Sequence, residues 1–481
     1  MYFSRKCDVP YFSRIVNIYL YTVFMVMSAE LSHITGTFVI DAMPSFLNGA
    51  GIAKYKNDKN LTILKTFADG TGESALADRE TGIEQGGPRK VKNYRTVFVS
   101  AQSFRRMWRD TLIAETGWKP SLMRAYEENN EGHTSKSGTG LDPVSYAEDA
   151  IFGYMFTIEG SGKPVVSAAT AITTNTDGTE LLVTETATVT EESNGEAGSV
   201  EVKQSRARVR SISRTSPLST SILVGLRKDA WQGTDEAYVH LKEGTPIPYD
   251  TQFANTPFTG IFSLNIKRLC RFTNAGDRME LSDKLVKEYL DSKLIVEVPD
   301  EKPEYYSLET KIEDVVVTKG KNKGKVVKGK ISTPAKKFGN VYELANNLGQ
   351  TRKERASAVI NSLAVLRGGA KQAAFGTDVS PKVLIMAGLT CGNPIFNTIF
   401  EDDNSSNTRG KTVSIDVDAL KEIVSDYKDR IVTPVYIGIR TGFLKYEEEL
   451  RRELNRMDGF IVTTPREAAR QLTERIPVDP S

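Results

Sequence analysis

The residues best suited to bind an anion lie between Ser100 and Arg109. The β-branched and aromatic run Thr96–Val99 leads into Ser100, a favoured N-cap for a helix that begins there. Backbone N–H groups in the first turn of a helix lack intrahelical partners and attract anions. This pattern predicts a grip on a phosphate backbone; an amphipathic helix with merely solvated arginines is the alternative. The polar and cationic side chains concerned are Ser100, Gln102, Ser103, Arg105, Arg106 and Arg109.

Two further segments could donate hydrogen bonds to phosphates. In Arg367–Gln372, two consecutive glycines would let backbone N–H groups approach a ligand closely, and the side chains of Arg367, Lys371 and Gln372 add donors. The same glycines could simply end the preceding helix. The turn at Asn48-Gly49 offers a side-chain amide that could reach a phosphate or a base.

The sequence contains none of the residue sets typical of common hydrolytic or metal-dependent enzymes. The three histidines and three cysteines are scattered, and no Cys/His pair has the spacing of zinc ligands. Gly410-Lys-Thr412 resembles the end of a phosphate-binding P-loop, but Ser405 occupies the position of the required earlier glycine. We therefore expect no metal and no cofactor, and the motifs of nucleotide hydrolysis are absent.

Bulk composition points to a cytoplasmic protein without a membrane partner. The chain has 481 residues, is 39% hydrophobic and carries a net charge of +2, so nucleic-acid binding would depend on local cationic clusters. Few and widely separated cysteines fit a reducing compartment. The apolar run Ile15–Met27 is too short to span a bilayer. We expect Met27 to be the true start and residues 1–26 to be a non-native or dispensable extension; a genuine extra segment or a targeting signal are the alternatives.

The remaining pattern predicts a single core over residues 27–481 with large insertions. Residues 31–41 alternate as in a strand, and from residue 340 onward the pattern is α/β. It includes a helix ending near Leu366, a buried strand at Val383–Met386 and a last helix opened by the capping box Thr464–Glu467. Insertions are expected at 53–93, 117–202, 216–260 (a protruding hairpin) and 311–337 (a lysine-rich hairpin with nine lysines and two acidic residues).

Five stretches follow one another in a recognisable order along the chain: Leu31–Gly49, Val99–Leu112, Asp149–Met155, Leu366–Ala373 with Ser380–Ile385, and Pro434–Gly442. Their shared order over residues 30–445 argues against a chance likeness. Together they resemble the CRISPR-associated DevR-type family, the backbone subunits of type I Cascade surveillance complexes, and most of all its type I-B members.

The resemblance implies an α+β fold, with an RNA-recognition-motif-like (ferredoxin-like) core and large finger-like and thumb-like insertions. It implies a non-catalytic subunit that oligomerises as a helical filament along guide crRNA and presents that RNA for pairing with target DNA. Copies of the chain itself and other Cascade subunits would be its partners. The Ser100 helix start, the Arg367–Gln372 segment and Asn48 would then contact the guide RNA.

Two other function classes stay open. In RNA-cleaving backbone subunits of type III effectors, an aspartate after the first strand does the chemistry, and Asp41 is the candidate here. The surrounding Ile40–Pro44 is more similar to the type I-B pattern. A transcriptional autoregulator is the second alternative, although no helix-turn-helix pattern is visible to support it.

Overall fold

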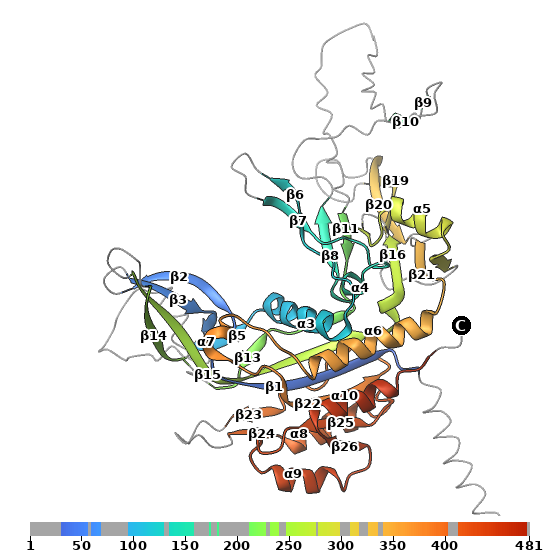
Figure 1. Ribbon diagram of the computed structural model, residues 1–481. Helices are drawn as coiled ribbons and strands as arrows, with labels where there is room; N and C mark the ends of the chain where they lie inside the picture. The colour runs from blue at the N-terminus through green and yellow to red at the C-terminus, as the bar shows by residue number, and fades with distance from the viewer. Residues whose placement is uncertain are drawn as a thin grey trace, which may run out of the picture.

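The protein has a mixed α+β architecture organised around one large sheet (Figure 1). The computed structural model describes residues 30–55, 59–68, 95–128, 134–157, 173–174, 180–181, 211–227, 231–239, 247–275, 278–298, 308–316, 326–334, 340–402 and 412–478. The expected extension at 1–26 and most of the 164–202 segment lie outside these ranges. The main path of the sheet runs in the order β26 (Phe460–Thr463), β25 (Val435–Ile439), β22 (Pro381–Leu389), β1 (His33–Ser45), β15 (Ile247–Asn265), β13 (Leu223–Gly225), β5 (Arg95–Val99) and β4 (Thr66–Ala68).

Strand β1 lies in the middle of this sheet. It pairs antiparallel with β15 on one side, where His33 lies opposite Asn265, and with β22 on the other, where His33 lies opposite Leu389. The predicted strand at 31–41 is confirmed and continues to Ser45. All residues from Ile34 to Ile40 are buried, because both faces of the sheet are covered at this point.

Three helices cover one face of the sheet: α3 (Ala101–Thr116), α6 (Leu348–Leu363) and α10 (Pro465–Glu474). In the chain, α3 lies between β1 and the strand pair β12 (Leu218–Thr220) and β13, and α6 lies between β15 and β22. The Trp108 side chain of α3 joins the two helices, since its Nε1 donates to the Val359 carbonyl and the Ser362 hydroxyl of α6, both at 3.0 Å. The main core therefore lies between β1, β15 and this helical layer.

The opposite face near the C-terminus packs on α8 (Val417–Asp426) and α9 (Glu447–Leu454), with a core that includes Ile385, Ile437 and Leu420. The predicted last helix is confirmed, with Thr464 as its N-cap. Helix α6 ends at Leu363, three residues before the expected end, and the chain reaches the Gly-Gly pair through a short turn.

A second sheet lies beside the first, in the order β18 (Ile295–Val298), β21 (Asn340–Leu344), β16 (Arg271–Ala275), β17 (Arg278–Met279), β11 (Ser211–Arg214) and β8 (Tyr154–Thr157). Helices α4 (Ala147–Phe152) and α5 (Asp283–Asp291) accompany it. The 3-10 helix η1 (Lys267–Cys270) carries the chain from β15 directly into β16. The two sheets are thus joined by a short, well-packed connection.

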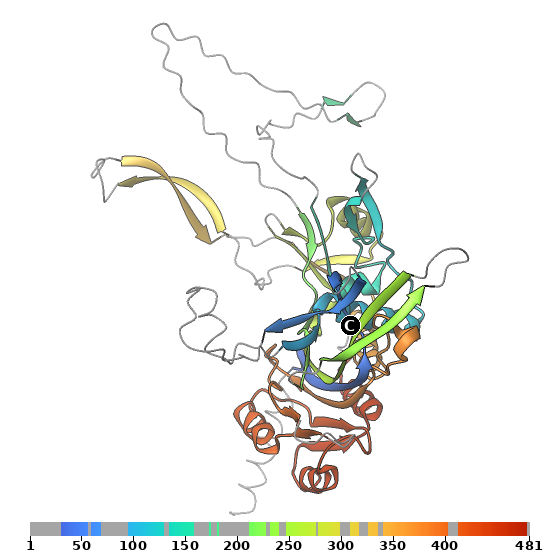
Figure 2. The same cartoon turned by 90° about the vertical axis from the view of Figure 1, so that its left-hand side faces the viewer.

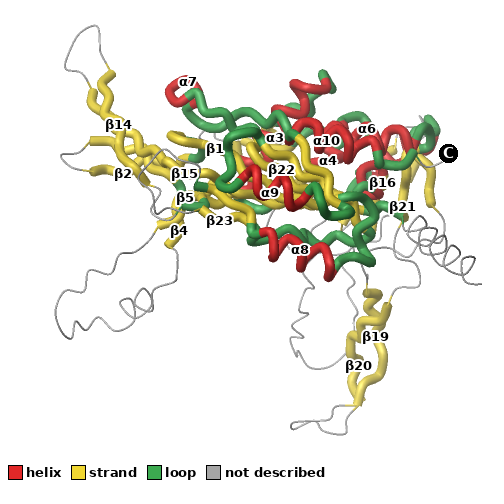
Figure 3. Tube along the Cα trace, turned by 90° about the horizontal axis from the view of Figure 1, so that it is seen from below, coloured by secondary structure: helices red, strands yellow, loops and turns green. Residues whose placement is uncertain are grey.

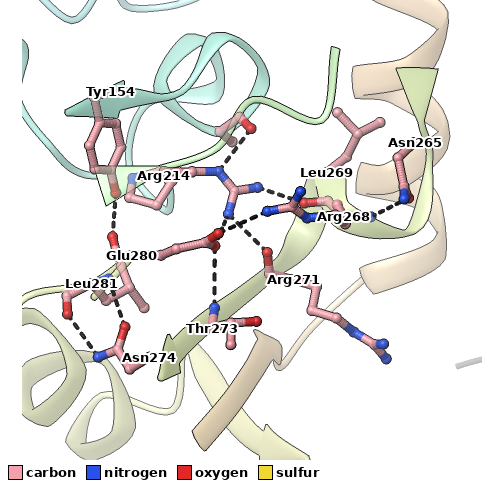
Figure 4. A network of polar contacts seen from close by, with 12 residues as sticks. Tyr154, Arg214, Asn265, Arg268, Leu269, Arg271, Thr273, Asn274, Glu280 and Leu281 are labelled. Carbon is pink, nitrogen blue, oxygen red and sulfur yellow. Dashed lines mark hydrogen bonds and ion pairs between the residues drawn. The ribbon is translucent and has the colours of Figure 1, made fainter. Parts of the chain in front are cut away.

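A buried ionic network fixes this connection (Figure 4). The Arg214 side chain is fully buried and pairs with Glu280 at 2.5 Å, and Arg268 of η1 pairs with the other oxygen of Glu280 at 2.9 Å. Arg214 also donates to backbone carbonyl groups of Ala150, Arg268 and Arg271. The basic residues Lys203, Arg206, Arg208, Arg210 and Arg214 alternate with short residues, a pattern that predicts a basic strand edge. This prediction is wrong for Arg214, because its strand β11 pairs with both β8 and β17 and its guanidinium holds three chain segments together.

The composition of residues 53–93 and 117–145, rich in polar residues and glycine, predicts loops or insertions, but the described parts of both segments contain strands. Strand β2 (Gly49–Tyr55) begins just before residue 53, and β3 (Lys59–Leu64) and β4 follow it within 53–93. Strands β6 (Arg124–Glu128) and β7 (Thr134–Gly138) lie within 117–145. Strand β3 pairs in parallel with β15, a long-range contact that local composition does not report. The remaining short elements are β9 (Thr173–Thr174), β10 (Glu180–Leu181), β23 (Phe400–Asp402), β24 (Val413–Ile415) and α7 (Gln372–Phe375).

Two hairpins leave the body of the molecule (Figure 2). One is formed by β14 (Trp231–Val239) and the first half of β15, so strands occupy most of the segment predicted as a turn-rich tip between Trp231 and Phe253. The other is the two-stranded ribbon β19 (Leu308–Val316) and β20 (Val326–Pro334), which pair only with each other among the described strands. Figure 3 shows this ribbon standing apart from both sheets.

Candidate nucleic-acid interface

The start of α3 is held in place by Asn48. The Ser100 hydroxyl caps the helix by accepting the Ser103 N–H at 3.3 Å, as the sequence predicts. The Ser100 N–H in turn donates to the Asn48 side-chain oxygen at 2.9 Å. The N–H groups of Ala101 and Gln102 have no acceptor within the described part of the chain. The helix start therefore presents two free backbone donors, while the oxygen of Asn48 serves to position it.

The segment 367–372 lies against the same place. The Ala370 N–H donates to the Leu47 carbonyl at 3.1 Å, next to Asn48. On the other side, the Arg367 N–H donates to the Thr111 hydroxyl of α3 at 3.1 Å. Hydrogen bonds therefore tie this segment to both the β1–β2 turn and α3, so the three sequence-predicted pieces form one continuous surface.

The two glycines of this segment have a structural reason of their own. Gly368 and Gly369 have φ values of +115° and +105°, which favour glycine strongly. A Cβ on Gly369 would lie 2.7 Å from Leu47 Cδ2, and one on Gly368 would lie 3.2 Å from Met107 Cγ. The glycines thus allow the segment to pack closely on the β1–β2 turn and on α3. The Gln372 amide stays within the segment by donating to the Gly368 carbonyl.

The arginines of α3 divide into two groups. Arg105 donates to the Leu218 and Phe152 carbonyls, both at 2.6 Å, and its burial lowers its pKa. Arg109 pairs with buried Glu148 at 2.7 Å and donates to the Ser121 carbonyl. The partners of these two guanidinium groups lie on α4, on β12 and in the loop after α3. They are engaged inside the protein, where the sequence pattern alone would leave them solvated.

Two arginines remain at the surface of the site. The Arg106 side chain is 70% exposed and pairs with Asp110 of the same helix at 2.6 Å. Arg367 is 59% exposed and pairs with Glu115 at the other end of α3. Exposed ion pairs of this kind contribute little to stability, so both cations can exchange their partner for a phosphate at small cost.

Lys371 occupies the most unusual environment of the ten predicted residues. It has a left-handed backbone conformation, with φ at +52°. Its ammonium donates to the Thr251 hydroxyl at 2.5 Å and lies 5.5 Å from the centre of the Phe46 ring and 5.8 Å from that of Tyr249. Among the described residues Lys371 has no ion-pair partner. A half-buried cation surrounded by neutral groups is well suited to attract an anion.

The aromatic residues around Lys371 were not singled out from the sequence. Phe253 stacks near Phe375 of α7, with ring centres 6.2 Å apart. Both rings line a cavity of about 520 Å³ together with Pro44, Thr234 and Asp235. Tyr249, Thr251 and Phe253 alternate along β15, and this spacing of two is the signal that could have placed them on one strand face.

Asp41 lies at the end of the paired region of β1 in a different setting. Burial raises the pKa of its carboxyl, Lys382 and Arg227 oppose this effect, and Asp378 adds to it. Its Oδ1 atom has no hydrogen-bond partner among the described residues. Within the same described ranges, no group of three His, Cys, Asp or Glu residues is arranged to hold a metal ion.

Comparisons with known proteins give structural likeness only. No family model matches the sequence, and no curated protein matches it. A solved chain titled "CRISPR RNA-guided surveillance complex" aligns over 92% of this chain and 99% of its own length, with 9% identity and a TM-score of 0.35. A second, titled "CRISPR RNA-guided surveillance complex, pre-nicking", aligns over 92% and 100%, with 9% identity and a TM-score of 0.38. Scores this low carry no argument about function. No helix in the described ranges is long and apolar enough to cross a membrane.

Proposed function

We propose that this chain is a non-catalytic backbone subunit of a type I Cascade complex, most like type I-B. In this proposal it oligomerises along guide crRNA in the cytoplasm, beside other Cascade subunits, and presents the guide for pairing with target DNA. One observation carries the proposal. The three segments expected to contact RNA are far apart in the sequence, yet they meet at the Leu47–Asn48 turn through the hydrogen bonds to Ser100 and Ala370.

The topology supports an RNA-recognition-motif-like core. The chain order β1, α3, β12/β13, β15, α6, β22 and the sheet order β22-β1-β15-β13 fit a βαββαβ ferredoxin-like unit with antiparallel pairing throughout. Both helices lie on one face, as that unit requires. The proposed RNA path begins at the end of α3 that follows β5 and runs along this helix to Arg367, which pairs with Glu115 near the other end.

The proposed phosphate contacts are four side chains and the N–H groups of Ala101 and Gln102, which have no acceptor among the described residues. Of the side chains, Arg106 and Arg367 are exposed, Lys371 is half-buried with no ion-pair partner in the described part of the chain, and Ser103 is half-buried at the helix start. None of these donors selects a particular base, which fits a subunit that holds any guide sequence. Asn48, Arg105 and Arg109 support this surface through their internal hydrogen bonds.

The test measures RNA affinity as a function of salt. Single-stranded RNAs of unrelated sequence should bind with equal affinity, and each lost phosphate contact should lower the slope of log K against log salt by about 0.7. Arg106→Gln and Lys371→Met should each produce this change for every RNA tested.

Arg470→Gln is the matched control. Arg470 is 55% exposed on α10 and pairs with Glu474 four residues along the helix, just as Arg106 pairs with Asp110. Its removal should leave both affinity and slope unchanged. If Arg106→Gln and Lys371→Met behave like Arg470→Gln in folded protein, the proposed interface is wrong.

A further inference from the structure

The surroundings of Lys371 connect two parts of the molecule, the 367–376 loop and the protruding β14–β15 hairpin. Lys371 belongs to the 367–376 loop, whereas Thr251 and Tyr249 belong to β15 where it pairs with β14. Phe375 and Phe253 add a second contact between the same two parts. The base of the hairpin is therefore held against the candidate RNA surface by one cation and a few aromatic rings.

The ammonium of Lys371 has the capacity to bind a ligand without leaving the hairpin. A lysine carries three N–H donors, and one of them is used by the Thr251 hydroxyl. The faces of the Phe46 and Tyr249 rings attract the cation electrostatically, but the rings accept no charge-assisted hydrogen bond from it. The side chain is half-buried, so part of it is open to solvent. A phosphate oxygen can add to this arrangement with Thr251 still in place.

We propose that Lys371 couples RNA binding to the position of the β14–β15 hairpin, and this rests on the proposed function above. A phosphate bound at the Lys371 ammonium restrains the side chain in the geometry that also holds Thr251. By thermodynamic linkage, a docked hairpin then strengthens phosphate binding by the same factor. RNA binding thus fixes the direction in which the hairpin projects.

Hydrogen exchange of the hairpin amides tests this coupling. We would use an RNA of about six nucleotides, short enough to occupy a single chain. In the unaltered protein, saturation with this RNA should slow exchange in β14 and in residues 247–253 by about fivefold, the lower end of typical coupling factors. Slowing confined to α3 and the 367–376 loop would overturn the proposal.

Thr251→Val separates coupling from simple phosphate binding. Thr251 is buried, and valine preserves its shape while removing the hydroxyl. The variant should bind RNA with an affinity lowered no more than about fivefold, should exchange its hairpin amides faster without RNA, and should lose the RNA-dependent slowing. Lys371→Met should lose both the salt-dependent contact and the slowing.

The outcomes distinguish the two proposals. RNA binding by the unaltered chain without slowing of the hairpin, or full slowing in Thr251→Val, overturns the coupling and leaves the proposed function intact. Absence of salt-dependent RNA binding in the unaltered chain overturns the proposed function and the coupling together.

Discussion

Replacing Arg214 by methionine should destabilise the protein strongly, because the groups that bind its guanidinium in Figure 4 have few other donors within reach. The side chain is 0% exposed, pairs with Glu280 and donates to three backbone carbonyl groups. Removing one partner of a buried ion pair costs about 3–5 kcal/mol. Glu280 would keep Arg268 at 2.9 Å and the Thr273 N–H at 3.2 Å. We therefore expect the lower end, about 3 kcal/mol.

A double-mutant cycle with Glu280→Gln separates the ionic contribution from lost packing. The double variant lacks the Arg214–Glu280 ion pair and both of its charges. Arg268 loses Glu280 in Glu280→Gln and in the double variant alike, so that loss cancels in the cycle. It should be less destabilised than the sum of the single variants by about 1–3 kcal/mol. The assay is urea unfolding, with attention to whether the slope m stays constant.

Two experimental results would contradict the stabilising role of Arg214. Strict additivity of Arg214→Met and Glu280→Gln would show that the pair makes no energetic contribution of its own. A loss of less than about 0.5 kcal/mol for Arg214→Met would be the value expected for an ordinary surface position and would contradict the burial itself. Arg470→Met, at an exposed ion pair, supplies that surface reference.

Three further predictions concern the candidate interface and Asp41. Gly369→Ala should destabilise the protein by at least about 1 kcal/mol and weaken RNA binding, because φ is +105° and the new Cβ would lie 2.7 Å from Leu47 Cδ2. Unfolding and RNA-binding curves measured on one preparation check both effects. Asp41→Asn should stabilise the protein near neutral pH and lose this advantage in acid, because a raised carboxyl pKa contributes stability only while the group is protonated; unfolding midpoints across pH measure it. The assembled protein should not cleave guide-complementary RNA with or without Asp41, and cleavage abolished in Asp41→Asn would move the chain to the RNA-cleaving class.

Local signals in the sequence predicted the elements well. Three of them depend only on residues that are close together in the sequence: the N-cap at Ser100, the N-cap at Thr464 and the buried strand at Val383–Met386. Such features are encoded by neighbours, so single-sequence reasoning can find them.

The roles of the arginines could not be predicted in the same way. Arg105, Arg109 and Arg214 carry the same charge as Arg106, yet they are bonded to carbonyl groups and carboxylates from distant segments. Only the approach of the second sheet decides which side of α3 is covered. Sequence reasoning missed the face of β15 that carries Tyr249 and Thr251, because the prolines and the glycine just before these residues favour a turn. Hairpin pairing with β14 overrides that preference.

The central position of β1 has a consequence for synthesis of the chain. As it emerges from the ribosome, β1 finds neither of its neighbours, since β15 ends at Asn265 and β22 ends at Leu389. Until then the apolar strand β1 has no hydrogen-bonded neighbour on either edge, and strands with unpaired edges are prone to aggregation. Strand β1 has both of its neighbours only after residue 389 has been added. Nascent chains that end before Leu389 should therefore depend on chaperones that bind extended apolar segments.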